Sequence, residues 1–256
     1  MSGLGVLLRK ELLEAWRTRR LPVVAVLFLV VGIISPLTAR YMGEILDLAL
    51  GDQMPIPLPA PTATSALEQL QKNMGQLGAL AAIALAMGSV SGELDRGTAA
   101  LVLAQPATRG AFLAAKLVAI GVVLAVGVLV ATVVAWVYTA VLFEPLPVGG
   151  WLVMAVLSWL ALMAWAAITF LASAATGSTT AAAGIGFVAL IGLSLLAVVP
   201  ALDRLLPTGL TLPAIQLAAG MSIPDGGRLA TAVAGTMTRI ALSLMGAWAG
   251  FRSREL

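Results

Sequence analysis

The sequence predicts an all-α integral membrane protein, a single transmembrane domain over residues 1–256 with six membrane-spanning helices. The mean hydropathy of the chain is +1.02, and only 11% of its residues are charged. A soluble globule of this size needs far more polar surface than this composition supplies. Uncharged stretches of about 20 residues, the length that a helix needs to cross a hydrocarbon core, recur along the chain. Such runs favour a bundle of helices over a barrel of alternating strands.

The first element expected is an amphipathic helix over residues 4–19. Its apolar residues recur at steps of four, at Leu4, Leu8, Leu12 and Trp16. The charged residues Lys10, Glu14 and Arg17 fall on another face. This pattern is typical of a helix lying in the plane of the membrane interface. A cleaved signal peptide is the alternative, but the acidic residues in its basic start and the absence of an A-x-A site argue against it.

The six apolar runs give the expected spans, with no second soluble domain between them. Their boundaries are 21–39, 74–92, 117–143, 151–175, 181–199 and 229–251. Residues 40–72, between the first two spans, are polar and include the Pro-rich stretch MPIPLPAPTATS, which predicts irregular structure. The short uncharged turn TGSTT at 176–180 predicts a helical hairpin.

Residues 200–228, before the last span, are apolar but broken by prolines at positions 207, 213 and 224. The pieces between the prolines are too short to cross a bilayer. We therefore expect re-entrant or interfacial helices here, on the extracytoplasmic side.

The distribution of Lys and Arg predicts the orientation of the bundle in a cell membrane. With the N-terminus inside, about ten basic residues lie in cytoplasmic segments and about four lie outside, as the positive-inside rule requires. Both termini are then cytoplasmic. The excess of basic charge, +3 overall, is explained by these flanks and gives no reason to expect a nucleic-acid partner.

A charged stretch, GELDRGTAALVLAQPATRG at residues 92–110, separates the second and third spans and falls in the cytoplasm in this orientation. Thr98 is placed to cap a helix of about two turns over residues 99–105, which Pro106 ends. Such a helix shows Leu101 and Leu103 outside the bilayer, where a partner protein could bind them. The alternative is an ordinary loop whose basic residues only anchor the adjacent spans.

This pattern resembles the ABC-2 family of ABC-transporter permeases. The residues that carry the resemblance in this stretch are Glu93, Asp95, Arg96, Gly97, Thr98, Leu101, Leu103, Pro106, Arg109 and Lys116. The N-terminal residues Arg9, Lys10, Glu11, Trp16 and Arg17 resemble the interfacial elbow helix of the same family. The sequence departs from the family pattern at Ala100, where Glu is frequent, and at Ala115, where Gly is frequent.

The resemblance implies that residues 93–116 form a coupling region that docks on a separate ATP-binding subunit. ATP and Mg²⁺ would bind in that subunit, and no cofactor is expected in this chain. The sequence agrees, because it has no G-x-x-x-x-G-K-[ST] motif for cradling phosphates and so is not expected to be an enzyme. The resemblance also implies a dimer with a second permease copy, identical or paralogous.

Few residues inside the spans carry chemistry. The chain contains no Cys or His, which removes thiol chemistry and the commonest metal and proton-carrying ligand, so no metal site is expected. All twelve acidic residues lie outside the predicted spans, which disfavours an ion-coupled carrier. Arg239 is the one charge deep in a span, on a stripe of small and polar residues with Ser243. These two residues are candidates for a substrate cavity, or Arg239 is a structural residue that snorkels or pairs.

The expected function is therefore that of an exporter permease for a lipid-like, drug-like or otherwise amphipathic substrate. A variant is a subunit that transmits force to an extracytoplasmic partner. The alternative from another class is a six-span scaffold or membrane-embedded enzyme, but without His or acids in the spans an enzyme has no evident base.

Overall fold

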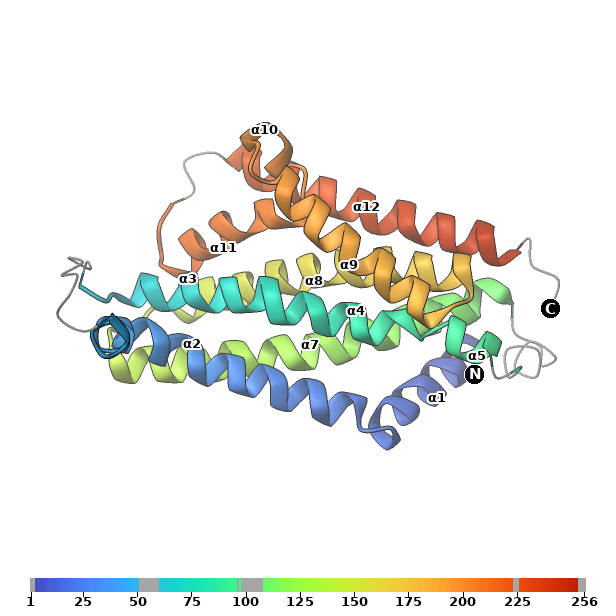
Figure 1. Ribbon diagram of the computed structural model, residues 1–256, viewed down its shortest axis with the longest axis horizontal. Helices are drawn as coiled ribbons and strands as arrows, with labels where there is room; N and C mark the ends of the chain where they lie inside the picture. Colours follow the sequence, from blue (N-terminus) through green and yellow to red (C-terminus); the bar gives the residue numbers. More distant parts are fainter. Residues whose placement is uncertain (1–2, 51–59, 96, 98–107, 223–225, 253–256) are drawn as a thin grey trace.

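The computed structural model describes residues 3–50, 60–95, 97, 108–222 and 226–252, with Asp47, Ala49 and Leu50 described by their backbone only. Every regular element in these ranges is helical, and the long helices run roughly along one axis (Figure 1). In chain order the elements are α1 (Gly3–Arg17), α2 (Arg20–Leu50), α3 (Ala63–Asn73), η2 (Met74–Gly78), α4 (Ala79–Met87), α5 (Ser91–Asp95), α7 (Arg109–Leu142), α8 (Val148–Thr176), α9 (Thr179–Leu196), α10 (Pro200–Asp203), η3 (Pro207–Leu210), α11 (Thr211–Ala218) and α12 (Gly226–Arg252).

Six segments of the described chain are long and apolar enough to cross a membrane, which confirms the predicted number. They are 20–46, 63–95, 109–142, 148–176, 179–196 and 226–252. The all-helical class is confirmed with them.

Several helices continue beyond the apolar runs that predict the spans. The first span was placed at 21–39, but α2 runs to Leu50; the second was placed from Met74, but helix begins at Ala63. Helix α7 begins at Arg109, ahead of the predicted Leu117. The physical reason is that a helix needs only its backbone hydrogen bonds and an end cap, and Thr62 and Thr108 supply side-chain caps at two of these starts. Of the Pro-rich stretch expected to be irregular, 54–59 lie outside the described residues, 60–62 are non-helical and 63–65 are helical.

The second span is not one regular α-helix. A π-helical turn, η2, follows α3, and the α-helix resumes as α4. At Gly88–Val90 the chain then leaves the helix before α5 begins at Ser91. Interruptions of this kind bring polar groups into the bundle that an unbroken helix would keep bonded to itself.

The bundle core lies on α7 and α8. Helix α2 crosses α7 where Gly32 faces the backbone of Ala131, and α11 packs on α8 where Gly150 faces the carbonyl of Leu217. A Cβ at either glycine would collide with backbone, so these contacts set how closely the helices approach. Helix α9 is mostly exposed, with apolar side chains such as Ile185, Val188 and Leu195 on its open face. In a bilayer, that face suits lipid or protein contact.

Both ends of the described chain lie at the same end of the bundle. Helices α1 and α2 meet at a bend that includes Arg19, whose φ of 60° lies in the left-handed region that non-glycine residues rarely adopt (Figure 1). As a result, α1, α5 and the last turn of α12 gather at one end, and α3 begins near α11 at the other (Figure 1). We call these the α1 end and the α11 end.

Residues 200–218 form the short helices α10, η3 and α11, too short to span, as predicted from their prolines. Asp203 accepts hydrogen bonds from Thr208 Oγ1 (2.9 Å) and Arg228 Nη2 (3.1 Å). These bonds fix the segment to the start of α12.

Candidate functional site

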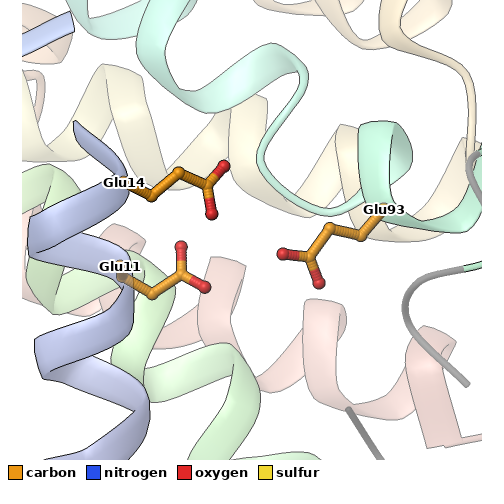
Figure 2. Close-up of side chains that lie close together, drawn as sticks. All are labelled: Glu11, Glu14 and Glu93. Carbon is orange, nitrogen blue, oxygen red and sulfur yellow. The ribbon is translucent and has the colours of Figure 1, made fainter. Parts of the chain in front are cut away.

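Five charged side chains from three helices form an ion cluster at the α1 end: Lys10, Glu11 and Glu14 from α1, Glu93 from α5 and Lys116 from α7. Glu93 Oε1 lies 2.8 Å from both Lys10 Nζ and Lys116 Nζ. Glu11 Oε1 accepts from the same two amines at 3.0 and 3.1 Å. Figure 2 shows the three carboxylates turned toward one another from α1 and α5. The cluster thus ties the amphipathic helix to the start of the charged stretch.

Lys116 lies at the centre of the cluster. Its side chain is only 4% exposed, and its Nζ lies 5.0 Å from the ring centroid of Phe112, a cation–π contact. A buried ammonium is tolerated because two carboxylates and an aromatic face replace its water. Phe112 in turn stacks on Phe251 of α12, with ring centroids 5.6 Å apart.

The three carboxylates are close enough together to share a cation. Two ammonium groups already lie among them, however, within hydrogen-bond distance of Glu11 and Glu93. The chemistry is therefore that of a neutralised ion-pair network, and it gives no support to a metal centre.

The charge state of Lys10 follows from these contacts. Burial works against its charge, but the hydrogen bonds and charges of Glu93 and Glu11 outweigh burial and raise the pKa of Lys10 above its ordinary value. A raised lysine pKa contributes stability that is fully present below the ordinary value of about 10.4 and is lost only above it. Lys10 is therefore charged at neutral pH.

The far end of the charged stretch is also anchored. Arg109, at the start of α7, donates from Nη1 to the carbonyls of Phe251 (3.2 Å) and Arg252 (2.9 Å) in the last turn of α12. Carbonyls at a helix C-terminus lack helical partners and carry partial negative charge, so a guanidinium is favourable there.

A third anchor is a network of hydroxyls at the break between α4 and α5. Ser173 Oγ of α8 accepts from the backbone N–H of Val90 (3.3 Å) and Ser91 (3.1 Å). It lies 3.2 Å from Ser91 Oγ, which lies 2.9 Å from Thr179 Oγ1 of α9. The N–H groups freed by the break are thereby capped by a side chain from another helix.

The structure brings together some of the predicted site residues. Glu93 and Arg109 are the two anchored ends of the charged stretch, and Lys10 and Glu11 meet Glu93 in the cluster. Four others lie at the surface: Asp95, Arg9, Arg17 and Trp16. Gly97 has a φ of 67°, a conformation that favours glycine. Arg96, Thr98, Leu101, Leu103, Pro106 and the helix expected at 99–105 lie outside the described residues.

The sequence did not predict the cluster as a unit. Lys116 was expected only to match a family pattern or to anchor a span, and Glu14 only to lie off the apolar face of the amphipathic helix. The signal that could have revealed Lys116 is its place in AFLAAKLVAIGV, where a lone lysine interrupts an apolar run and needs a buried partner.

Arg239 and Ser243 lie on the face of α12 that turns into the molecule. Arg239 Nη1 donates to the carbonyl of Leu205 (3.1 Å), and Ser243 is buried. On the same stripe, Gly235 faces the Leu205 backbone and Gly246 faces Leu171 of α8. The stripe therefore packs against the chain itself.

Six helical segments of membrane-spanning length in the described chain define a multi-pass membrane protein, and the two ends of its charged stretch are bonded to the bundle at the α1 end. Residues 6–216 match the family described as ABC-2 family transporter protein, and the chain belongs to that family. Membership identifies it as a membrane protein of the ABC-2 transporter type.

A relative in Bacillus subtilis (strain 168), an uncharacterized transmembrane protein named YxlG, is 31% identical over 118 residues. The match spans 45% of this chain and 46% of the relative, less than half of each.

Proposed function

We propose that this chain is the permease subunit of an ABC exporter, and that force from a separate ATP-hydrolysing subunit enters it through residues 93–116. The ion cluster carries the proposal. Glu93 is where the charged stretch begins, and its 2.8 Å contacts reach both the amphipathic helix α1 and the buried Lys116 of α7. A displacement of the stretch therefore pulls on two helices at once.

The other anchors extend the same argument. Arg109 holds the far end of the stretch to the last turn of α12, and Ser173 holds its near end to the α8–α9 hairpin. Transmission of motion from the charged stretch to the bundle requires hydrogen-bonded contacts at both ends of the stretch. If one end were loosely attached, that end would move without moving the helices. We infer that ATP and Mg²⁺ bind in the partner and that residues 99–105 form the helix that docks on it.

Export of a lipid-like, drug-like or other amphipathic substrate is proposed because the described surface of the bundle is dominated by apolar helix faces, on α9 above all. We also propose that two permease subunits act together as a dimer, and this part of the proposal rests on the family alone. In this dimer, Arg239 and Ser243 make their contacts within each subunit and do not contact the other subunit.

The test of the coupling proposal is co-purification. A protein with Leu101→Asp and Leu103→Asp should lose its ATPase partner by at least about tenfold, as expected when apolar contact residues of an interface become charged. The matched control carries Leu202→Asp and Leu205→Asp, a leucine pair exposed near α10, and should retain the partner. A wild-type protein that retains no ATPase from its native membrane contradicts the proposal.

Orientation has its own test, because the chain lacks cysteine and each introduced thiol is unique. We propose that the α1 end is cytoplasmic. Ala60→Cys, near the start of α3, should react with a membrane-impermeant maleimide on intact cells. Thr180→Cys, in the α8–α9 hairpin, should react only after permeabilisation. Both residues are exposed, so access alone decides the outcome. The reverse pattern would place the charged stretch outside and remove the basis for coupling.

A further inference from the structure

A polar side chain lies buried inside the second span. Gln71, on α3, is only 7% exposed. Gln71 lies about 12 Å along the helix axis from Ala63, where the helix begins, at a rise of 1.5 Å per residue. Polar side chains within spans are expensive, and they mark functional positions when the protein does not fully satisfy them.

The hydrogen bonds of Gln71 leave part of its amide unused. Ser158 Oγ of α8 lies 3.0 Å from Gln71 Oε1 and 2.8 Å from the carbonyl of Met154. One hydroxyl proton serves only one of these acceptors. Turning the Gln71 amide over lets its NH₂ donate to Ser158 while Ser158 donates to Met154, which satisfies all three groups. In either arrangement, the other end of the amide has no partner within the part of the chain that the structure describes.

Gln71 lines a narrow cleft. The cleft is bounded by α3 and η2 on one side, α8 and α9 on the other, and η3 and α11 at the α11 end. The hydroxyl-bearing residues Ser194, Thr208 and Thr211 line it together with Gln71, and the Thr208 hydroxyl, which donates to Asp203, remains an acceptor.

Apart from Ser158, the partner of Gln71, the rest of the lining is largely apolar, with Leu157 and Trp165 from α8 and Leu190 from α9. None of the described lining residues is ionisable. A charged group entering the cleft would lose water and find no counter-charge, at a cost far above that of a neutral group. An uncharged group with a hydroxyl or amide would find donors and acceptors, and the apolar walls suit a chain attached to it.

The wall that Gln71 belongs to is irregular where the cleft opens. The π-helical turn η2 begins three residues after Gln71, and Gly75 within that turn lines the cleft. Such turns are uncommon and recur at functional sites, because they expose backbone groups that a regular helix conceals.

We propose that this cleft binds the uncharged, hydroxyl- or amide-bearing polar end of an amphipathic molecule, with Gln71 as the residue that recognises it. As a substrate site the inference rests on the proposed exporter function, and it names the substrate class as neutral amphipaths.

The experiment uses the full chain alone in phosphatidylcholine nanodiscs, with no ATPase present, so that failure of the coupling proposal does not affect it. The probe is a monoacylglycerol with a photoreactive diazirine in its acyl chain. Cross-links should map to α8 and α9 around Leu157, Trp165 and Leu190. Monoolein should compete, whereas oleylamine and oleate, with the same chain but a charged head, should compete at least about tenfold more weakly.

The variant Gln71→Leu keeps the size of the side chain and removes its amide, so the apparent affinity for monoolein should fall about fivefold to tenfold, the loss of one hydrogen bond. The matched control is Gln76→Leu, an exposed glutamine on η2 that does not line the cleft, and it should bind as the wild type does. If Gln71→Leu fails to fold, the competition of monoolein, oleylamine and oleate for the wild-type protein tests the proposal by itself. Equal competition by the charged amphipaths, cross-links elsewhere, or unchanged binding by folded Gln71→Leu would each overturn the proposal.

Discussion

Replacing Lys116 with Met is expected to destabilise the protein by about 3–5 kcal/mol, the range measured when one partner of a buried ion pair is removed. Lys116 is 4% exposed, and its loss leaves Glu11 and Glu93 facing each other with only Lys10 between them. Met preserves the length of the side chain, so lost packing contributes little. Thermal unfolding in detergent, followed by loss of monomer on size exclusion, measures the change.

Lys10→Met is the matched control, because Lys10 contacts the same two carboxylates but is 39% exposed. Pairs reached by solvent contribute about 0–1 kcal/mol, so this variant should be far milder. Adding Glu93→Gln to Lys116→Met should recover part of the stability by removing one of the orphaned charges. If the two lysine variants unfold alike, Lys116 is not the centre of the cluster.

The same variants separate stability from coupling. At a temperature where Lys116→Met remains folded, the proposed function predicts that ATP hydrolysis by the assembled complex continues while transport per ATP falls. The reason is that Glu93 then reaches α1 through Lys10 but no longer reaches α7. A variant that loses hydrolysis and transport in equal proportion would favour a purely structural cluster.

The sequence alone predicted an all-helical membrane protein and the number of its spans, because hydropathy distinguishes helices surrounded by lipid from helices surrounded by water. It also identified Glu93, Arg109, Lys10 and Glu11 as candidate site residues, through the family resemblance of the short patterns that contain them. It did not predict that Glu93 meets Lys10, since the two are 83 residues apart in the chain and only tertiary packing joins them.

Helix boundaries were predicted less well, for a physical reason. Hydropathy marks the most apolar part of each span, and α2 and α3 extend beyond that part as helix, α3 with Thr62 as its N-cap. Gln71 was therefore assigned to an external polar region, although the structure buries it on a helix of the second span. The role of Ser173 had no sequence signal, because a serine that caps a distant helix break looks like any serine on an Ala-rich helix.

Ser173→Ala is expected to cost about 2–4 kcal/mol, although it removes a single oxygen. That oxygen is fully buried and accepts from the N–H groups of Val90 and Ser91, which have left the α4 helix and have no other backbone acceptor among the described residues. Each buried donor left unsatisfied costs about 1–3 kcal/mol.

Amide hydrogen exchange checks this directly. In Ser173→Ala the amides of Val90 and Ser91 should exchange at least about tenfold faster, one decade for each 1.4 kcal/mol of protection lost. The matched control is Thr176→Ala, one turn further along α8, where the hydroxyl bonds Ala172 O and the Ser178 N–H at the exposed surface and water replaces it. That variant should change stability by less than about 0.5 kcal/mol. Unchanged exchange at both amides in Ser173→Ala would mean that the break is capped in another way, and that the α8–α9 hairpin is not tied to the charged stretch through this hydroxyl.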